Sequence, residues 1–200
     1  MTEPRRADKT DRAAAAATLG AAFLADPLMS WIRRSNAGER HLRAYFRAEL
    51  GAVLSDSDHL TFVTPDVAAV AMWRDVDKWK PGFTEIVRML PAGLRGFRSR
   101  AGIRAIQRIE KAHPREHHYY LETLGTHPGR QGEGLGGSLV SVMTDRADAE
   151  GLPCYLESSN PENEPFYMRK GFEVREELDL GKGAPVFRTM WREPREPDQS

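Results

Sequence analysis

The chain has 200 residues, of which 40% are hydrophobic, and its 29 basic residues (Lys and Arg) balance 29 acidic ones (Asp and Glu). This length and apolar content predict one globular domain and exclude an intrinsically disordered chain. The balanced charge excludes a strong field toward nucleic acid or an anionic membrane, and the single cysteine, Cys154, excludes an internal disulfide and a cysteine-based zinc site.

The first residues lack the apolar core of a secretion signal, and no run of about 18 apolar residues is available to span a bilayer. We therefore expect a cytoplasmic protein without a membrane or nucleic-acid partner. The histidines do not combine with carboxylates or cysteines at metal-ligand spacing, so we expect no metal site. Composition does not decide between a monomer and a homodimer.

The N-terminal half predicts two helices. Residues 1–9 are polar and are expected to be flexible. Asp11 is placed to cap an alanine-rich helix over residues 13–24, and Pro27 marks the end of that helix. A second helix is predicted over residues 37–54, because four apolar residues recur there at helical spacing, namely Leu42, Phe46, Leu50 and Val53.

Two strands, 60–63 and 67–73, follow as a hairpin around a Pro65-Asp66 turn. Glycines and prolines interrupt the pattern over residues 76–118, where a basic helix is predicted from about Leu94 to Lys111. Its arginines are interpreted as a solvent-exposed face, with contact to an anionic cofactor or partner as the alternative.

Strands and helices alternate in the C-terminal half. The predicted strands are 119–126, 154–158, 172–174 and 184–191, and the predicted helices are 135–150 and 161–169, which stop at Gly151 and Gly171. The last residues are polar and are expected to fray. Together, these elements predict a single domain over residues 10–192 with a flexible tail over residues 193–200.

A glycine-dense segment joins the strand 119–126 to the helix 135–150. It reads Gln131-Gly132-Glu133-Gly134-Leu135-Gly136-Gly137-Ser138. Glycines let a backbone approach an anion closely, and the first turn of a helix offers unpaired amides and the positive end of its dipole. The segment therefore predicts a cradle for the phosphates of a cofactor. We expect the Glu133 side chain to face solvent and the Ser138 hydroxyl to add a hydrogen bond.

The same segment satisfies the dinucleotide-binding pattern G-x-G-x-x-G, and Glu157 lies twenty residues beyond Gly137, where a ribose-binding acid belongs. Three features disfavour that interpretation. Five residues separate the strand from Gly132, too few residues follow for the remaining parallel strands, and the N-terminal half resembles a meander. A P-loop NTPase is disfavoured because no Gly-Lys-Ser or Gly-Lys-Thr follows the glycines.

Three motifs, in order, resemble the GNAT (GCN5-related N-acetyltransferase) family. The segment 131–136 resembles the family's Arg/Gln-x-x-Gly-x-Gly/Ala pyrophosphate loop, and residues 124–128 resemble the end of its fourth strand. Asn160 and the segment 165–172 resemble the family's later Asn and its Phe-Tyr-x-x-x-Gly-Phe motif. The resemblance is strongest over residues 118–174, and the layout is most similar to the puromycin N-acetyltransferase-like branch.

This resemblance implies an α/β (α+β) fold. A single GNAT-type domain would contain a mixed, mostly antiparallel sheet of six to seven strands, splayed between strands four and five and flanked by helices. The resemblance also implies acetyl-CoA as the cofactor, with its pyrophosphate on the loop and its pantetheine arm beside the end of strand four. The residues implied in cofactor binding are Leu124, Gly125, Thr126, Gln131, Gly132, Glu133, Gly134, Leu135, Gly136, Gly137, Ser138, Asn160 and Phe166.

Tyr167 matches the family's frequent general acid, which would protonate the departing thiolate of coenzyme A, although a core aromatic is the alternative. Glu122 lies within strand four and Glu157 on the neighbouring strand. Either carboxylate is a candidate base for the incoming amine, with Glu122 slightly preferred, and His117, His118 and His127 are further alternatives. The alternative for each is a salt-bridged surface residue.

We expect an apolar acceptor site lined by aromatic residues, namely Trp31, Trp73, Trp79, Phe83 and Tyr119. The sequence thus predicts an acetyl-CoA-dependent N-acetyltransferase. It would act by direct attack in a ternary complex on the primary amine of a small molecule, such as an antibiotic or a metabolite. A non-catalytic acyl-CoA-binding module and a protein or peptide N-acetyltransferase are the alternatives.

Overall fold

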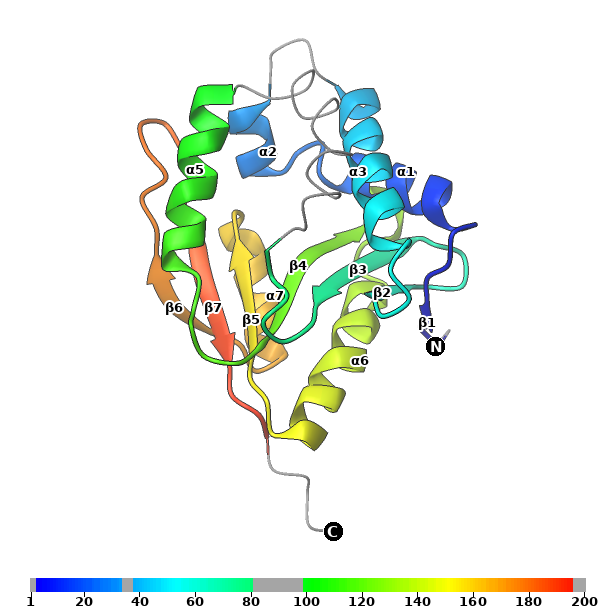
Figure 1. The fold of residues 1–200 in the computed structure, drawn as a ribbon. Coiled ribbons are helices and arrows are strands. Elements are labelled where there is room, and N and C mark those ends of the chain that lie inside the picture. The colour runs from blue at the N-terminus through cyan, green and yellow to red at the C-terminus, as the bar shows by residue number, and fades with distance from the viewer. Residues whose placement is uncertain (1–2, 34–37, 81–98, 196–200) are drawn as a thin grey trace.

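The computed structural model describes residues 3–33, 38–80 and 99–195, which form one seven-stranded sheet with helices on both faces (Figure 1). The strands lie in the order β1-β2-β3-β4-β5-β7-β6. Neighbouring strands are antiparallel except β4 and β5, which are parallel. This mixed, mostly antiparallel sheet confirms the fold that the sequence implied.

The bounds of most elements agree with the prediction. The strands are β1 (Arg5–Arg6), β2 (Leu60–Val63), β3 (Ala69–Arg74), β4 (Tyr119–Thr126), β5 (Cys154–Ser158), β6 (Glu173–Glu177) and β7 (Arg188–Arg192). The helices are α1 (Arg12–Ala22), α2 (Pro27–Ile32), α3 (Glu39–Val53), α5 (Ser99–Ala112), α6 (Leu135–Glu150) and α7 (Glu164–Arg169), with single 3-10 turns at Pro128–Arg130 and Pro161–Asn163.

The N-terminal region differs from the prediction in three ways. Arg5 and Arg6 pair with Val63 and Phe62 as the short strand β1, which the polar sequence did not predict. The Asp11 side chain binds the Arg5 guanidinium at 2.7 Å and makes no cap for α1. Pro27 was expected to mark the end of the first helix, but α1 ends at Ala22 and Pro27 begins the short helix α2. Proline suits the first helical position, which needs no amide hydrogen.

The two faces of the sheet are covered by different helices, as Figure 1 shows. On one face, α6 packs on β3 and β4, and its buried residues join a core that contains Leu121 and Leu156. On the other face, α1 packs against α3 and on β3. The four residues that predicted the helix 37–54 are all buried in this second core, as Leu42, Phe46, Leu50 and Val53.

The parallel strands β4 and β5 separate after a short contact. They pair only from Tyr119 with Cys154 to Leu121 with Leu156, whereas β4 continues to Thr126 and β5 to Ser158. The predicted splay of the sheet is therefore confirmed, and it leaves the end of β4 unpaired on that side. Among the described residues, no helix is both long and apolar enough to cross a membrane.

Candidate functional site

A cleft of about 590 Å³ lies beside the unpaired end of β4. Four segments form its walls: the turn from α1 to α2, the end of β4, the glycine loop before α6, and residues 160–169. The cleft brings together most of the residues that the sequence singled out. They are Leu124, Gly125, Thr126, Gln131, Gly132, Gly134, Leu135, Gly136, Gly137, Asn160, Phe166 and Tyr167.

The glycine loop has a backbone that side chains would disturb. Gly132 has a φ of +83° and Gly134 a φ of +79°, which residues with a Cβ rarely adopt. The first hydrogen bond of α6 runs from the Ser138 amide to the Gly134 carbonyl, at 3.0 Å. The four amides of residues 134–137 therefore have no partner within the helix. Together with the helix dipole, these amides provide a site for an anion at the cleft wall.

Glu133 and Ser138 belong to the predicted loop, but neither lines the cleft. The Glu133 carboxylate is exposed and lies 2.7 Å from the Arg130 guanidinium. The Ser138 hydroxyl donates to the Leu135 carbonyl at 2.8 Å, and its amide is already used within α6. The expectation that Ser138 offers a further donor is therefore not supported, because the helix begins at Leu135 and Ser138 falls in its first bonded turn.

Two arginines line the cleft, although the sequence analysis did not select them as site residues. Arg130 ends the 3-10 turn that leads into the loop, and its guanidinium is paired with the carboxylates of Glu133 and Asp66, each at 2.7 Å. Arg169 lines the cleft from the end of α7 and is exposed. Guanidinium groups bind phosphate oxygens in a planar, bidentate geometry, so the exposed Arg169 is suited to a phosphorylated ligand, whereas Arg130 is engaged by two carboxylates.

Tyr167 contributes a buried phenol to the cleft from the middle of α7. Burial raises the pKa of this phenol, and the nearby charge of Asp26 raises it further. The phenol is therefore protonated at neutral pH and can donate a proton or a hydrogen bond into the cleft.

Asp26 is a cleft residue that the sequence analysis missed. One carboxylate oxygen caps α2 by accepting a hydrogen bond from the Met29 amide at 2.8 Å, and the other accepts from the Ser159 hydroxyl at 2.5 Å. Burial raises the pKa of Asp26 despite these bonds. The Asp-Pro pair at the start of α2 indicates a cap, but the contact with Ser159 arises only in the folded chain.

The two candidate bases lie on the sheet face opposite α6. Leu121 and Leu156 pack in the core under α6, so the alternation along each strand turns Glu122 and Glu157 to the other side. Neither carboxylate lines the cleft itself. They mark the point at which β4 and β5 cease to pair.

The surroundings of the two carboxylates differ. Glu122 binds the Arg74 guanidinium through two hydrogen bonds, at 2.7 Å and 3.0 Å. Glu157 has a side chain only 6% exposed, and its Oε1 lies 3.7 Å from Nδ1 of His113. Glu122 is thus held as an ion pair, whereas Glu157 faces a second titratable group.

The aromatic residues expected at an acceptor site are dispersed. Trp73 and Tyr119 are buried in the core beside α6, and the Tyr119 hydroxyl binds Glu150 at 2.5 Å. Neither lines the cleft, whereas Trp73 lines a second pocket. Alternation placed them on the covered face of the sheet. Trp79 stacks on His113 with ring centres 3.8 Å apart, and Trp31 packs beside Leu180 and Phe187. The expected contribution of Phe83 lies outside the described residues.

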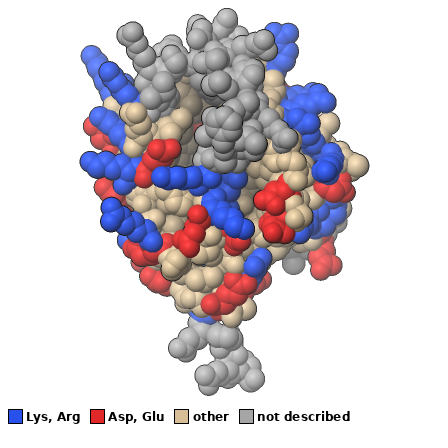
Figure 2. All heavy atoms as spheres, in the orientation of Figure 1, with Lys and Arg blue, Asp and Glu red and all other residues tan. Residues whose placement is uncertain are grey.

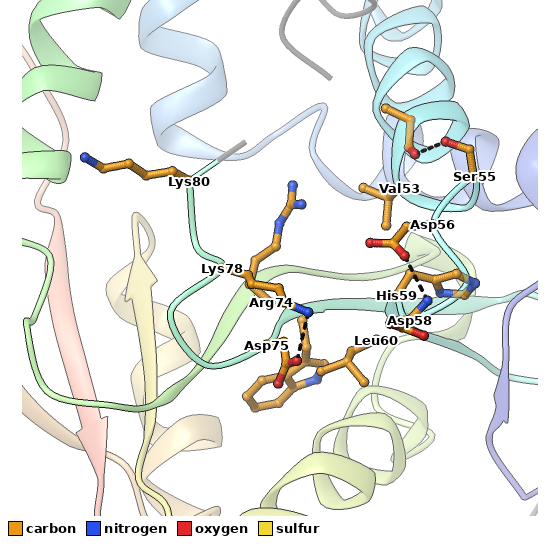
Figure 3. Close-up of a pocket in the computed structure, with 12 residues that line it drawn as sticks. Val53, Ser55, Asp56, Asp58, His59, Leu60, Arg74, Asp75, Lys78 and Lys80 are labelled. Carbon is orange, nitrogen blue, oxygen red and sulfur yellow. Dashed lines mark hydrogen bonds and ion pairs between the residues drawn. The ribbon is translucent and has the colours of Figure 1, made fainter. Parts of the chain in front are cut away.

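A second pocket of about 500 Å³ lies between the end of α3, the start of β2 and the end of β3 (Figure 3). Lys78 and Asp75 face each other there, with Nζ 3.4 Å from Oδ2. Burial, assisted by the charge of Arg6, lowers the pKa of His59. Among the described residues, this pocket and the cleft share no lining side chain, so the pocket is a separate feature.

Comparison with known proteins gives a consistent result for sequence and fold. The model of the acetyltransferase (GNAT) family matches residues 27–172. An uncharacterized N-acetyltransferase from Schizosaccharomyces pombe is 37% identical over 65 residues, which cover 32% of this chain and only 26% of that protein.

Two solved structures are similar over nearly the whole chain. One, described as histone acetyltransferase HPA2 and related acetyltransferase from Corynebacterium glutamicum, has a TM-score of 0.73 at 23% identity and covers 99% of both chains. The other, arylalkylamine N-acetyltransferase 2 from Aedes aegypti, has a TM-score of 0.64 at 13% identity, covering 96% of this chain and 99% of that one. At these identities both structures show a shared fold and nothing of the acceptor.

Proposed function

The chain belongs to the acetyltransferase (GNAT) family, and from this premise we propose that it acetylates the primary amine of a small molecule by direct attack in a ternary complex. As a member of that family it is an acyl-CoA-dependent acetyltransferase, and family membership favours an enzyme over a non-catalytic binding module. One observation carries the proposal: the unpaired amides at the start of α6 and the phenol of Tyr167 open into the same cleft.

The residues of the cleft fit coenzyme A in the order in which they occur. The amides of residues 134–137 would hold the pyrophosphate, and Arg169 would supply positive charge beside it. Residues 124–126 pair with β3 on one side, and their other edge, which β5 does not reach, would bind the amides of the pantetheine arm as an added strand. Asn160 accepts a hydrogen bond from the Glu162 amide through Oδ1, which leaves Nδ2 as its donor toward that arm.

The bound cofactor supplies a thioester carbonyl, and the side chains of the chain supply the proton transfers. Tyr167 would donate its phenolic proton to the departing sulfur, a role that its protonated state at neutral pH supports. Glu157 would take the proton that the attacking amine must lose. We prefer it to Glu122, because the guanidinium of Arg74 stabilises the charged form of Glu122 and weakens it as a base.

A small cationic amine is the proposed acceptor, and Asp26 is its proposed binding partner. Asp26 contributes a carboxylate to the cleft wall beside Tyr167, where an ammonium group would gain a charged hydrogen bond. Acidic and basic side chains are interspersed on the face shown in Figure 2. Such a surface gives no electrostatic preference for a strongly charged macromolecule, which supports a small molecule over a basic protein tail.

The experiment is a thiol-release screen with acetyl-CoA and a panel of amines. The panel contains aminoglycosides, aminonucleosides, polyamines, arylalkylamines and amino acids, with short peptides as the comparison class. Release of free CoA with a small amine, and not with peptides, would support the proposal. Release with peptides alone would replace the small-molecule acceptor with a peptide amine. CoA binding without release by any amine would contradict the proposed activity.

A further inference from the structure

The start and the end of α7 are each held by an arginine of β7. At the start, Nη1 of Arg188 lies 2.6 Å and 2.8 Å from the two carboxylate oxygens of Glu164, the first residue of α7. At the end, Nε of Arg192 donates to the carbonyl of Lys170, which follows the last residue of the helix, at 2.9 Å. Side chains alternate between the faces of a strand, so Arg188 and Arg192, four residues apart, point to the same face of β7.

Arg188 also joins the start of α7 to two further strands. Its Nη2 lies 3.0 Å from Oε2 of Glu177, the last residue of β6. In the sheet, Arg188 pairs with Ser158, the last residue of β5. Residues 160–169, which form one wall of the cleft, leave the sheet just beyond that point. Arg188 therefore ties the wall that carries Tyr167 to the end of the sheet.

The pair of Arg188 and Glu164 is largely shielded from solvent. The side chain of Glu164 is 11% exposed and that of Arg188 is 30% exposed. An exposed ion pair contributes little because water screens it, whereas removal of one partner of a shielded pair leaves a charge uncompensated. A carboxylate in the first turn also interacts favourably with the helix dipole. We therefore expect this pair to restrict where α7 can lie.

The place of the Tyr167 phenol depends on where α7 lies. Tyr167 is three residues after Glu164, so both side chains lie on one side of the helix. An isolated helix of six residues is not stable in water, so its position has to be fixed by contacts with the rest of the fold. A displacement of about 1 Å at a reacting group can lower a rate about 10²-fold. A residue that fixes α7 can thus control the chemistry without touching the substrate.

We propose that Arg188 is a positioning residue, whose pair with Glu164 fixes the start of α7 and so places the Tyr167 hydroxyl in the cleft. This inference rests on the proposed function, in which Tyr167 donates a proton to the departing sulfur. Arg188 does not line the cleft, so it acts through the helix and not on the reacting atoms. Arg192 supports the other end of α7, but it is 3% exposed and also binds Asp148 of α6, so Arg188 is the better residue to change.

The test compares Arg188→Met with a matched control, Arg5→Met. Arg5 binds Asp11 through two hydrogen bonds of 2.7 Å, and the two side chains are 40% and 7% exposed, close to the values for Arg188 and Glu164. Each variant leaves a shielded carboxylate without its arginine, but only Arg188→Met does so at α7. Arg188→Lys keeps the charge without the planar fork, so it should show the same changes to a smaller degree. It replaces Arg188→Met if that variant does not fold.

The first readout is the ionisation of Tyr167 in the free, full-length protein, followed by the ¹³C shift of its Cζ. In the wild type and in Arg5→Met we expect no ionisation up to about pH 10, the ordinary value for a phenol, because burial raises the pKa of Tyr167. In Arg188→Met we expect partial ionisation there, because water reaches a displaced phenol. Loss of the positive charge alone would raise the pKa, so the expected change reports displacement. No ionisation in folded Arg188→Met, or equal ionisation in Arg5→Met, would overturn the inference.

The second readout is turnover with an amine found in the screen. Arg188→Met should lower kcat about 10- to 10²-fold and leave KM for acetyl-CoA little changed, because the contacts to the cofactor remain. In a Tyr167→Phe background the same change should have little further effect, since the hydroxyl that Arg188 places is gone. Equal losses in both backgrounds would show a role in stability alone and overturn the inference. If no amine reacts, the proposed activity fails, while the titration of Tyr167 still decides the role of Arg188.

Discussion

The guanidinium of Arg74 on β3 binds both carboxylate oxygens of Glu122 on β4, from Nε at 2.7 Å and from Nη2 at 3.0 Å. This bidentate pair is a strong interaction, and it favours the charged, weakly basic form of Glu122. Glu157, one strand away, is buried beside His113 instead. The two carboxylates are alike in sequence but have different surroundings, and for this reason we propose Glu157 as the base in place of Glu122, which the sequence analysis preferred.

Exchange of each carboxylate for its amide separates the two roles. We expect Glu157→Gln to lower kcat by about 10²-fold, the lower range for loss of a general base. Glu122→Gln should leave kcat within about threefold and instead lower the melting temperature, because Arg74 loses its charged partner. Thiol-release kinetics at saturating acetyl-CoA, together with thermal melts, measure both effects. The reverse order of kcat losses would identify Glu122 as the base.

Removal of the Tyr167 hydroxyl should affect turnover but not binding. We expect Tyr167→Phe to lower kcat by about 10²- to 10⁴-fold, the range for loss of a general acid. The dissociation constant for CoA, measured by calorimetry, should change little. Because burial raises the pKa of Tyr167, the wild-type pH profile should show no alkaline loss from this group below about pH 10. A fully active Tyr167→Phe enzyme would remove the phenol from the mechanism.

The glycine loop offers a test with a matched control. Gly134 and Gly151 flank α6, both have a positive φ (+79° and +67°), and an added Cβ meets no atom within 4 Å at either position. Alanine at either site should therefore cost a similar backbone strain of about 1 kcal/mol, measured by chemical denaturation. Aspartate at Gly134 should in addition abolish CoA binding, because it adds a negative charge at the anion site.

Calorimetry with CoA distinguishes the two ends of the helix. Gly151→Asp should bind CoA like the wild type, since this glycine lies at the C-terminus of α6, away from the cleft. Comparable affinity in Gly134→Asp and Gly151→Asp would place the pyrophosphate elsewhere.

Asp26→Asn should change stability and activity in opposite directions. Burial raises the pKa of Asp26, so the folded protein holds this proton more tightly than the unfolded chain does. Ionisation of Asp26 therefore costs stability progressively as the pH rises above its unfolded value of about 4. Asparagine keeps a cap for α2 and removes that cost, so the variant should melt at an equal or higher temperature at pH 7, with the gain lost below about pH 4.

The same variant should lose affinity for the acceptor. Loss of a charged hydrogen bond to an ammonium group corresponds to about a ten- to hundredfold fall in kcat/KM for the amine. A lower melting temperature at pH 7 would show that the ionised carboxylate stabilises the fold. An unchanged kcat/KM would show that Asp26 does not contact the amine.

Local signals predicted the part of the molecule that holds the cleft. The alternation of β4 and the glycines at positions 134 and 151 act over a few residues, so the strand, the turn and α6 could be located from sequence. Contacts between segments that lie far apart in the sequence could not be predicted in this way. Asp26 meets Ser159 across 133 residues of sequence, and His113 meets Glu157 only because α5 leads back to the sheet. Strand β1 depends on backbone pairing, which its two arginines do not signal.

A crystal structure of the protein with coenzyme A bound would decide where the cofactor lies. We expect the pyrophosphate oxygens within hydrogen-bond distance of the amides of residues 134–137, the pantetheine arm along residues 124–126, and the sulfur beside the Tyr167 hydroxyl. Coenzyme A bound in the pocket lined by Arg74 and Asp75, or with its sulfur remote from Tyr167, would contradict the proposed site and the mechanism built on it.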